Sequence, residues 1–334
     1  MKRSVALVVL AALACLAVAG MLAGVSVNRF LQTPVAPDGE PLIIIQAGTP
    51  LQRIAERLEK SGVIGSARYF TLLARWQGKA TQVQAGEYLF VEPALPDEVL
   101  HRLVVGDVRM VRITLPEGLT LRETAQRIAD FGLCSLDKAL DAIANPELLK
   151  RHAVPAANLE GYLFPETYTL RSNMTVEELV EAMLVEGEAR LQADMLDAAK
   201  GLGLDRHQLV TLASIIQKEA GNNSEMPLIS AVFHNRLRAG IPLQADPTVI
   251  YGVPDFDGNL TRKHLATPTP YNTYQRRGLP AGPIANPGEA ALRAAAWPAD
   301  VGYLYFVARG DGTHEFNTTL AQHNRAVRRY QLGR

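Results

Sequence analysis

The sequence contains little cysteine and no surplus of either charge. Cys15 and Cys134 are the only cysteines among 334 residues, so neither a disulfide framework nor a cysteine-based zinc site is expected. Lys plus Arg and Asp plus Glu each number 34, which gives zero net charge. A basic surface for nucleic-acid binding is therefore not indicated.

Several catalytic signatures are also missing. The seven histidines are scattered, and no two stand four residues apart as a helical metal-binding pair requires. The sequence has no Gly-x-Ser-x-Gly elbow and no phosphate-binding glycine loop. Metalloenzymes, serine hydrolases and nucleotide enzymes thus have no support, and we expect no metal or organic cofactor.

One long hydrophobic run stands at the N-terminus. Lys2 and Arg3 precede the uncharged residues 4–27, and about 20 apolar residues suffice for a membrane-spanning helix. A cleaved signal peptide ending at 17–19 is the alternative, but the apolar run continues beyond that site. We therefore predict a cytoplasmic segment 1–3, an anchor at 4–27 and a linker at 28–41, with the rest outside the cytoplasm.

A strand followed by a helix occurs twice in the next part of the chain. The first copy has an apolar strand at 42–45 and a turn at Gly48, and the second has a strand at 113–115 and a turn at Gly118, 70 residues later. This pattern predicts a LysM-like module at 42–110 and a second related unit at 111–170. No aromatic row indicates a sugar platform, so a glycan-binding module and a packed spacer both remain open.

The third part, 171–334, is predicted to carry the chemistry. A long amphipathic helix is expected over 175–200, followed by another that begins at Asp205. In the second helix Leu209, Leu212, Ile216 and Glu219 share one face. A carboxyl group on an apolar face has a raised pKa, as a general acid requires. The alternative is a structural Glu219 paired with Arg236 or Arg238.

Turn-rich segments follow this helix at 243–252, 267–274, 278–288 and 303–307. Such segments commonly carry binding sites, and their Asn, Gln and Tyr side chains suit sugar hydroxyl and acetamido groups.

Seven short motifs resemble those of the MltG (YceG-like) family of endolytic murein transglycosylases. They are LEGYLFPETY at 159–168, ASIIQKE at 213–219, NRL at 235–237, QADPTV at 244–249, YNTY at 271–274, GLP at 278–280 and FNT at 316–318. The resemblance implies an α+β protein with a single anchor in the bacterial inner membrane and an extracytoplasmic catalytic domain. It also implies peptidoglycan strands as substrate and peptidoglycan synthases as possible partners. One departure is Gln217, where many relatives are expected to carry Glu.

The resemblance assigns catalysis to Glu219. This residue would protonate the bond between N-acetylmuramic acid and N-acetylglucosamine, and would then accept the proton of the sugar's own 6-hydroxyl, leaving a 1,6-anhydro end. Gln244, Asp246, Tyr271, Asn272 and Asn317 are candidate sugar contacts. Two alternatives remain: a hydrolytic muramidase that uses Glu219 and Asp246 as a pair, and a non-catalytic peptidoglycan-binding scaffold.

Overall fold

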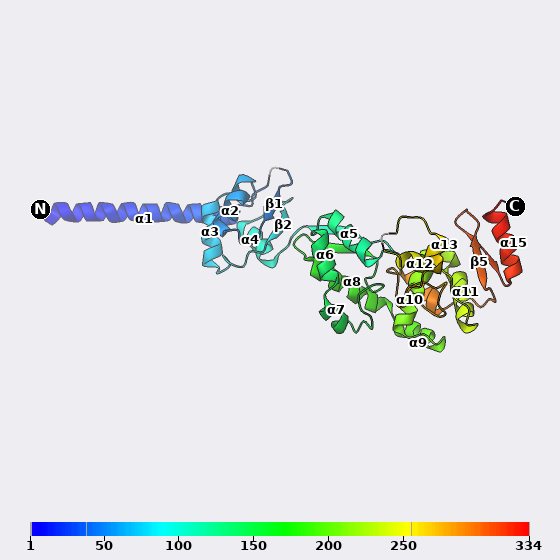
Figure 1. The fold of residues 1–334 in the computed structure, drawn as a ribbon. Helices are drawn as coiled ribbons and strands as arrows, with labels where there is room; N and C mark the ends of the chain where they lie inside the picture. The colour runs from blue at the N-terminus through cyan, green and yellow to red at the C-terminus, as the bar shows by residue number, and fades with distance from the viewer. Residues whose placement is uncertain (1, 38, 255, 334) are drawn as a thin grey trace. The chain divides into compact units, whose positions relative to one another are not determined.

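The structure is a computed structural model that describes residues 2–37, 39–254 and 256–333. Residues 1, 38, 255 and 334 lie outside it, and they belong to the predicted segments 1–3, 28–41 and 171–334. The chain is a mixed α+β protein with two compact units (Figure 1). Unit 1 comprises Met1–Val111 and Thr169–Met174, and unit 2 comprises Arg112–Tyr168 and Thr175–Arg334.

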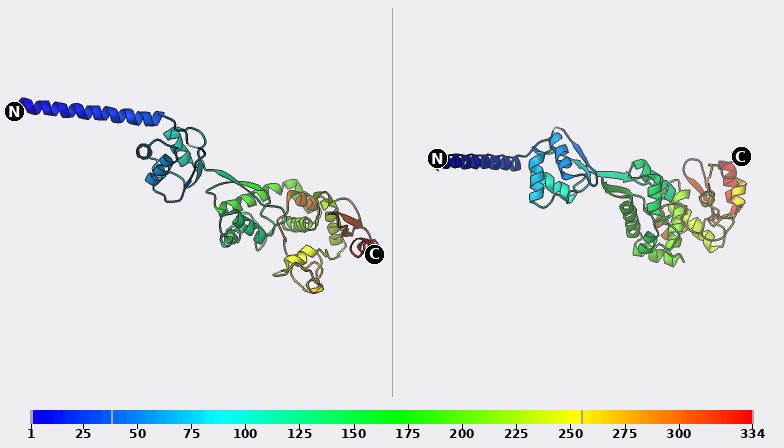
Figure 2. Two further views of the ribbon diagram at one scale, coloured as in Figure 1. Left: turned by 90° about the horizontal axis from the view of Figure 1, so that it is seen from above. Right: turned by 60° about the vertical axis from the view of Figure 1, so that its left-hand side comes forward.

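Unit 1 begins with a long helix. Its elements are α1 (Lys2–Gln32), β1 (Leu42–Ile45), α2 (Leu51–Lys60), α3 (Ala67–Trp76), β2 (Gly86–Leu89) and α4 (Pro96–Val105). Figure 2 traces α1 as one uninterrupted helix. Its stretch Leu13–Gln32 has a mean hydropathy of 1.6 and is 6% buried, so it is long and apolar enough to cross a membrane.

The core of unit 1 is formed by a two-stranded sheet and the helices around it. β1 pairs with β2 in antiparallel register, with Leu42 opposite Leu89 and Ile45 opposite Gly86. Alternate strand residues point inward, so Ile43 and Ile45 are buried. Phe30, near the end of α1, joins the same core, and its ring lies 5.6 Å from that of Tyr69.

The second predicted strand-helix segment likewise begins with a strand and two helices, but a third helix precedes its second strand. It contains β3 (Met110–Thr114), α5 (Leu121–Phe131), α6 (Leu136–Ile143), α7 (Pro146–Arg151) and β4 (Thr167–Arg171), and β3 pairs with β4. Thr120 and Glu123 form a capping box at the start of α5, and Gly132 ends the helix in a left-handed conformation at φ 88°. That the two segments superpose stays a prediction.

Unit 2 holds the remaining helices and one hairpin. They are α8 (Val176–Arg190), α9 (Ala193–Gly201), α10 (Arg206–Glu219), the short 3₁₀ helix η1 (Asn223–Glu225), α11 (Met226–Arg238), α12 (Asp246–Tyr251), α13 (Arg262–Ala266), α14 (Glu289–Ala296), β5 (Tyr305–Ala308), β6 (His314–Asn317) and α15 (Leu320–Tyr330). The helix expected over 175–200 is in fact two, because Leu191 and Gln192 leave the helical conformation. The break directs Met195 and Ala199 of α9 into the core.

Helix α10 is the centre of unit 2. Every residue from Leu209 to Ile216 is buried, and α10 packs against α14, α11 and α9. Its first residues are fixed by Asp205, whose side chain accepts a hydrogen bond from the backbone N–H of Gln208 at 2.8 Å. The helix therefore holds its last residue, Glu219, at a defined place.

Asn286 connects segments that are far apart in the sequence. Its side-chain oxygen accepts hydrogen bonds from the backbone N–H groups of Gly161 at 3.0 Å and Leu163 at 3.2 Å. Its backbone N–H donates to the carbonyl of Leu119, and its carbonyl accepts from Gly118, both at 2.8 Å. Only 2% of Asn286 is exposed, so water cannot replace these bonds.

We expect Asn286→Ala to lower the free energy of unfolding by about 2–4 kcal/mol, because it leaves the partly buried N–H of Gly161 and the buried N–H of Leu163 without an acceptor. Chemical denaturation and thermal melting measure this change. Asn324→Ala is the control, since Asn324 is exposed on α15 and its replacement is expected to alter stability by less than about 0.5 kcal/mol. Equal stability of the two variants would contradict the role given to Asn286.

Candidate functional site

A cleft of about 370 Å³ opens at the C-terminal end of α10. One side is formed by Glu219, by Arg236 of α11 and by the segment from Leu243 to Asp246. The other side is formed by the β5–β6 hairpin and α15, which pack side by side (Figure 1). The lining residues are Glu219, Arg236, Leu243, Gln244, Asp246, Tyr274, Phe306, Val307, Ala308, His314, His323, Val327 and Gln331.

Glu219 and Asp246 are the acidic residues of this cleft, and Glu219 is the last residue of α10. Glu219 is partly buried, and among the residues that the structure describes none forms a hydrogen bond or ion pair with its side chain. Burial, followed by the nearby Asp246 carboxylate, raises the pKa of Glu219 to about 8, although Arg236 opposes the shift. The negative end of the α10 dipole acts in the same direction as burial. Glu219 is therefore largely protonated at neutral pH.

Arg236 is close to Glu219 but uses its donors elsewhere. Its Nε donates to the carbonyl of Leu304 at 2.7 Å, and its Nη1 donates to the carbonyl of Leu243 at 2.7 Å. Arg236 is 8% exposed, so these carbonyls satisfy a buried cation. The sequence left open that Glu219 is a structural residue paired with Arg236 or Arg238. In the part of the chain that the structure describes, neither arginine pairs with Glu219.

The segment after Leu243 brings two predicted residues into the cleft. Gln244 has a left-handed backbone with φ 51°, which is unusual for a residue with a side chain. Thr273 fixes this segment, because its hydroxyl accepts the Ala245 backbone N–H at 3.0 Å. Asp246 is the exposed first residue of α12 and accepts a hydrogen bond from the Tyr274 hydroxyl at 2.6 Å. Strained backbone of this kind is frequent at functional sites.

A partly buried His–Glu pair supports the opposite wall. His314 Nδ1 lies 2.8 Å from Glu225 Oε2, and the His314 backbone N–H donates to Glu225 Oε1 at 3.0 Å. The imidazole packs edge-on against Phe306, with ring centroids 5.3 Å apart. His314 lines the cleft, so the pair fixes the orientation of a ring nitrogen there.

Three predicted sugar contacts lie outside the cleft. The Asn272 side chain is 0% exposed and donates to the backbone carbonyls of His264, Leu265 and Thr267. Tyr271 packs against Tyr251, with ring centroids 4.6 Å apart. Asn317 is 7% exposed in β6, opposite Tyr305. These three residues therefore contribute to packing and hydrogen bonding within the fold, and they do not line the cleft with Glu219.

Four titratable lining residues are not among the site residues predicted from the sequence. Tyr274 belongs to the quoted motif at 271–274, but the motif does not tell which of its members faces the cleft. Arg236 was considered only as a partner for Glu219. His314 and His323 come from the C-terminal segment, and nothing in their spacing connects them with Glu219, about 100 residues earlier.

Gln217 is not one of the residues that line the cleft. Its side-chain oxygen accepts the backbone N–H of Gly288, at the start of α14, at 3.0 Å. A carboxylate would be able to accept the same bond, so this position serves the packing of α10 against α14 and not proton transfer in the cleft.

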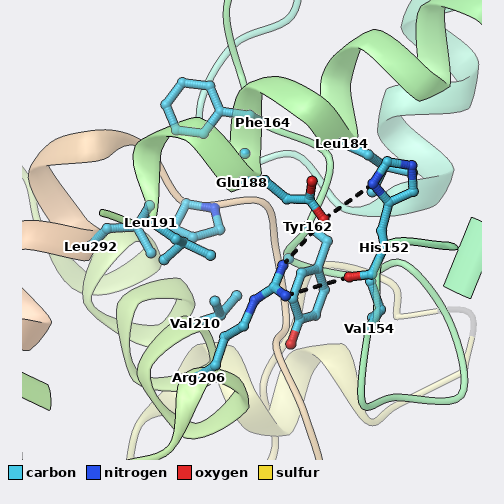
Figure 3. Close-up of a pocket in the computed structure, with 13 residues that line it drawn as sticks. His152, Val154, Tyr162, Phe164, Leu184, Glu188, Leu191, Arg206, Val210 and Leu292 are labelled. Carbon is cyan, nitrogen blue, oxygen red and sulfur yellow. Dashed lines mark hydrogen bonds and ion pairs between the residues drawn. The ribbon is translucent and has the colours of Figure 1, made fainter. Parts of the chain in front are cut away.

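A smaller cavity, of about 10 Å³, lies near the start of α10 (Figure 3). Figure 3 shows Arg206 extending toward Glu188 and His152, with its guanidinium 5.6 Å from the Tyr162 ring centroid. His152 Nδ1 lies 3.2 Å from Glu188 Oε1. This space holds at most about one water molecule, so it supports α10 and is not a binding site for a sugar.

A metal site is not found either. Within the described parts of the chain, no cluster of three or more His, Cys, Asp or Glu side chains is arranged to hold an ion.

The sequence profile of the YceG-like family matches residues 43–329. The chain is a member of the YceG-like family. The resemblance noted from the seven motifs is thereby confirmed.

Relatives of this YceG-like chain include proteins of known name and structure. It is 32% identical over 324 residues to the endolytic murein transglycosylase of Bacillus subtilis (strain 168), covering 91% of this chain and 89% of that protein. It is 30% identical over 295 residues to that of Streptococcus pneumoniae serotype 2 (strain D39 / NCTC 7466), covering 79% of this chain and 53%, about half, of the relative. A crystal structure of a YceG-like protein from Listeria monocytogenes matches with a TM-score of 0.59 and 31% identity, covering 86% of this chain and 98% of that one.

The raised pKa of Glu219 makes the stability of this YceG-like chain dependent on pH. Between the unfolded pKa and the folded value of about 8, the unfolded carboxyl is ionised while the folded one keeps its proton. The wild-type protein should therefore lose stability relative to Glu219→Gln as pH rises from 5 to 8, by up to about 1.4 kcal/mol per pH unit.

Denaturant melts at pH 5, 6, 7 and 8 measure this difference. Glu177→Gln, an exchange of an exposed glutamate in α8, is the control and should show no comparable trend. A constant difference between Glu219→Gln and wild type across this range would contradict the raised pKa.

Proposed function

We propose that the chain is an endolytic lytic transglycosylase that cleaves peptidoglycan glycan strands. The observation that carries the proposal is a protonated carboxyl group, Glu219, without an ion-pair partner among the described residues, in an open cleft of a YceG-like protein. The names of the Bacillus and Streptococcus relatives support the same reaction.

The proposed reaction uses one carboxyl group twice. Glu219 donates its proton to the glycosidic oxygen as the bond between that oxygen and C1 of N-acetylmuramic acid breaks. The 6-hydroxyl oxygen of the same sugar then forms a bond to C1, and its proton passes to the Glu219 carboxylate. The products are a 1,6-anhydro end and a free 4-hydroxyl on N-acetylglucosamine, and no water is consumed.

The surroundings of Glu219 suit both steps. Burial keeps the acid protonated before cleavage, while the positive charge of Arg236 stabilises the carboxylate formed afterwards. His314 and Gln244 present polar groups at the cleft, and such groups can hold sugar hydroxyls.

Asp246 is better placed as an electrostatic neighbour than as a second catalytic group. Its carboxylate raises the pKa of Glu219 and accepts the Tyr274 hydroxyl at 2.6 Å. A hydrolase would need this carboxylate to activate water or to attack C1. The Tyr274 hydroxyl already occupies one oxygen of this carboxylate.

We expect Glu219→Gln to reduce formation of anhydro product by about 100-fold or more, because the amide cannot donate the required proton. Asp246→Asn should reduce activity less. It should instead move the alkaline limb of the pH–kcat/KM profile, set by the Glu219 pKa of about 8, to lower pH, because it removes the charge that favours protonation.

Mass spectrometry of products from uncrosslinked strands measures both effects, with thermal melting as the folding control. Equal collapse of both folded variants, with reducing instead of anhydro ends, would favour the muramidase alternative. Full activity of folded Glu219→Gln would refute the assignment of the acid.

We further propose that α1 anchors the protein in the bacterial inner membrane, with Lys2 and Arg3 in the cytoplasm. The apolar stretch of α1 and the positive residues before it support this topology. Such an anchor would place the enzyme beside peptidoglycan synthases, whose nascent strands it would release.

A reporter enzyme that works only in the cytoplasm, fused after Arg334, is expected to be silent. A periplasmic reporter at the same position should be active and serves as the matched control. Cytoplasmic reporter activity would contradict the orientation, and a mature N-terminus near Gly20 would contradict the uncleaved anchor.

The segment at 42–110 is proposed to be a LysM-like module. Its order of strand, helix, helix and strand, with β1 and β2 antiparallel, supports this assignment. Its role would be to hold glycan near the membrane.

A further inference from the structure

A second large pocket of unit 2 is rich in arginine. It has a volume of about 780 Å³ and lies between the segment 201–205, the start of α10, the end of α11 and the segment 276–280. Arg238, Arg276 and Arg277 line it, together with His207 and His234. Asp205 is the one acidic residue of the lining.

The positive charge of this pocket is not neutralised. Within the described residues, none of the three arginines has a carboxylate within ion-pair distance. The Asp205 carboxylate accepts the backbone N–H of Gln208 at the start of α10. The charge of three guanidinium groups is therefore opposed by one carboxylate that already caps a helix.

The arginines also keep unused hydrogen-bond donors. Arg276 Nε is buried and has no hydrogen-bond partner, while Nη1 of the same side chain donates to the carbonyl of Pro270. Arg238 Nη2 donates to the side-chain oxygen of Asn235. The guanidinium N–H groups that these bonds leave free can donate to a carboxylate or phosphate oxygen of a ligand.

The pocket and the catalytic cleft are built from the same two segments. In α11, Arg236 lines the cleft and Arg238 lines the pocket. In the loop after Thr273, Tyr274 lines the cleft and Arg276 lines the pocket. Residues two apart have Cα atoms at most about 7.6 Å from each other, so the two spaces are close neighbours.

We propose that Arg238, Arg276 and Arg277 form an anion subsite that holds an acidic group of the glycan strand beyond the sugars that react. The inference rests on the proposed function, since it takes the ligand of the cleft to be peptidoglycan. Two parts of that substrate carry the required oxygen anions. They are the carboxylates of the stem peptides and the diphosphate that joins a nascent strand to its lipid carrier. Arginine binds both through paired N–H donors.

The test compares three strands: strands stripped of peptides, strands with stem peptides, and peptide-bearing strands on a lipid diphosphate. Binding is measured with the full-length Glu219→Gln protein in detergent, so that the strands stay intact, and KM and kcat are measured with the active enzyme. The variant replaces Arg238, Arg276 and Arg277 with Gln. The control replaces Arg122, Arg262 and Lys263 with Gln. These three cations are exposed and lie outside the pocket, so the two variants lose the same number of positive charges.

The pocket variant should lose affinity for anionic strands at least about tenfold more than for stripped strands, which corresponds to the roughly 1.4 kcal/mol of one charge-assisted hydrogen bond. A loss with every peptide-bearing strand identifies stem-peptide carboxylates, and a loss only with the lipid-linked strand identifies the diphosphate. Equal losses on all three strands, no loss on any, or the same losses in the control variant would overturn the subsite. Absence of anhydro product from the folded wild type would instead contradict the proposed function, while the binding data would still decide the subsite.

Discussion

The cleft depends on one constraint: the Glu219 carboxyl group lies close to the Arg236 guanidinium but forms no ion pair with it. Arg236 is buried beside Glu219, yet its guanidinium donates to the carbonyls of Leu304 and Leu243. A direct ion pair would hold Glu219 as a carboxylate and remove the acid. Because the carbonyls occupy the guanidinium, burial and the Asp246 charge dominate, and the pKa of Glu219 stays raised.

The same two carbonyl contacts assemble the walls of the cleft. Leu304 precedes β5, and Leu243 precedes the strained Gln244 and the exposed Asp246. One buried side chain thus connects the C-terminal hairpin with the loop that contributes Gln244. The cleft geometry and the protonation state of its acid therefore have a common physical origin.

The rest of unit 2 supports the two ends of α10. Asp205 caps its first turn, and the Arg206, Glu188 and His152 cluster holds that end against α8. Gln217 binds Gly288 near the other end, and Ser214 inside the helix donates to the Thr211 carbonyl while accepting the Ile284 N–H. An acid at the end of a helix buried along most of its length cannot move far, and such preorganisation favours catalysis.

The sequence by itself determined the α+β class, the apolar N-terminal helix, the family and the position of Glu219 on the apolar side of α10. Capping boxes and helical spacing are local patterns, and a single segment is enough to reveal them.

Tertiary structure alone decided which polar residues meet Glu219. Asn272 and Tyr274 belong to one motif of four residues, yet the first is buried among loop carbonyls and the second reaches Asp246. His314 meets Glu225 across 89 residues, and Leu191 ends a helix that its own sequence would continue. These outcomes depend on packing between distant segments, and no local pattern in the chain records that packing.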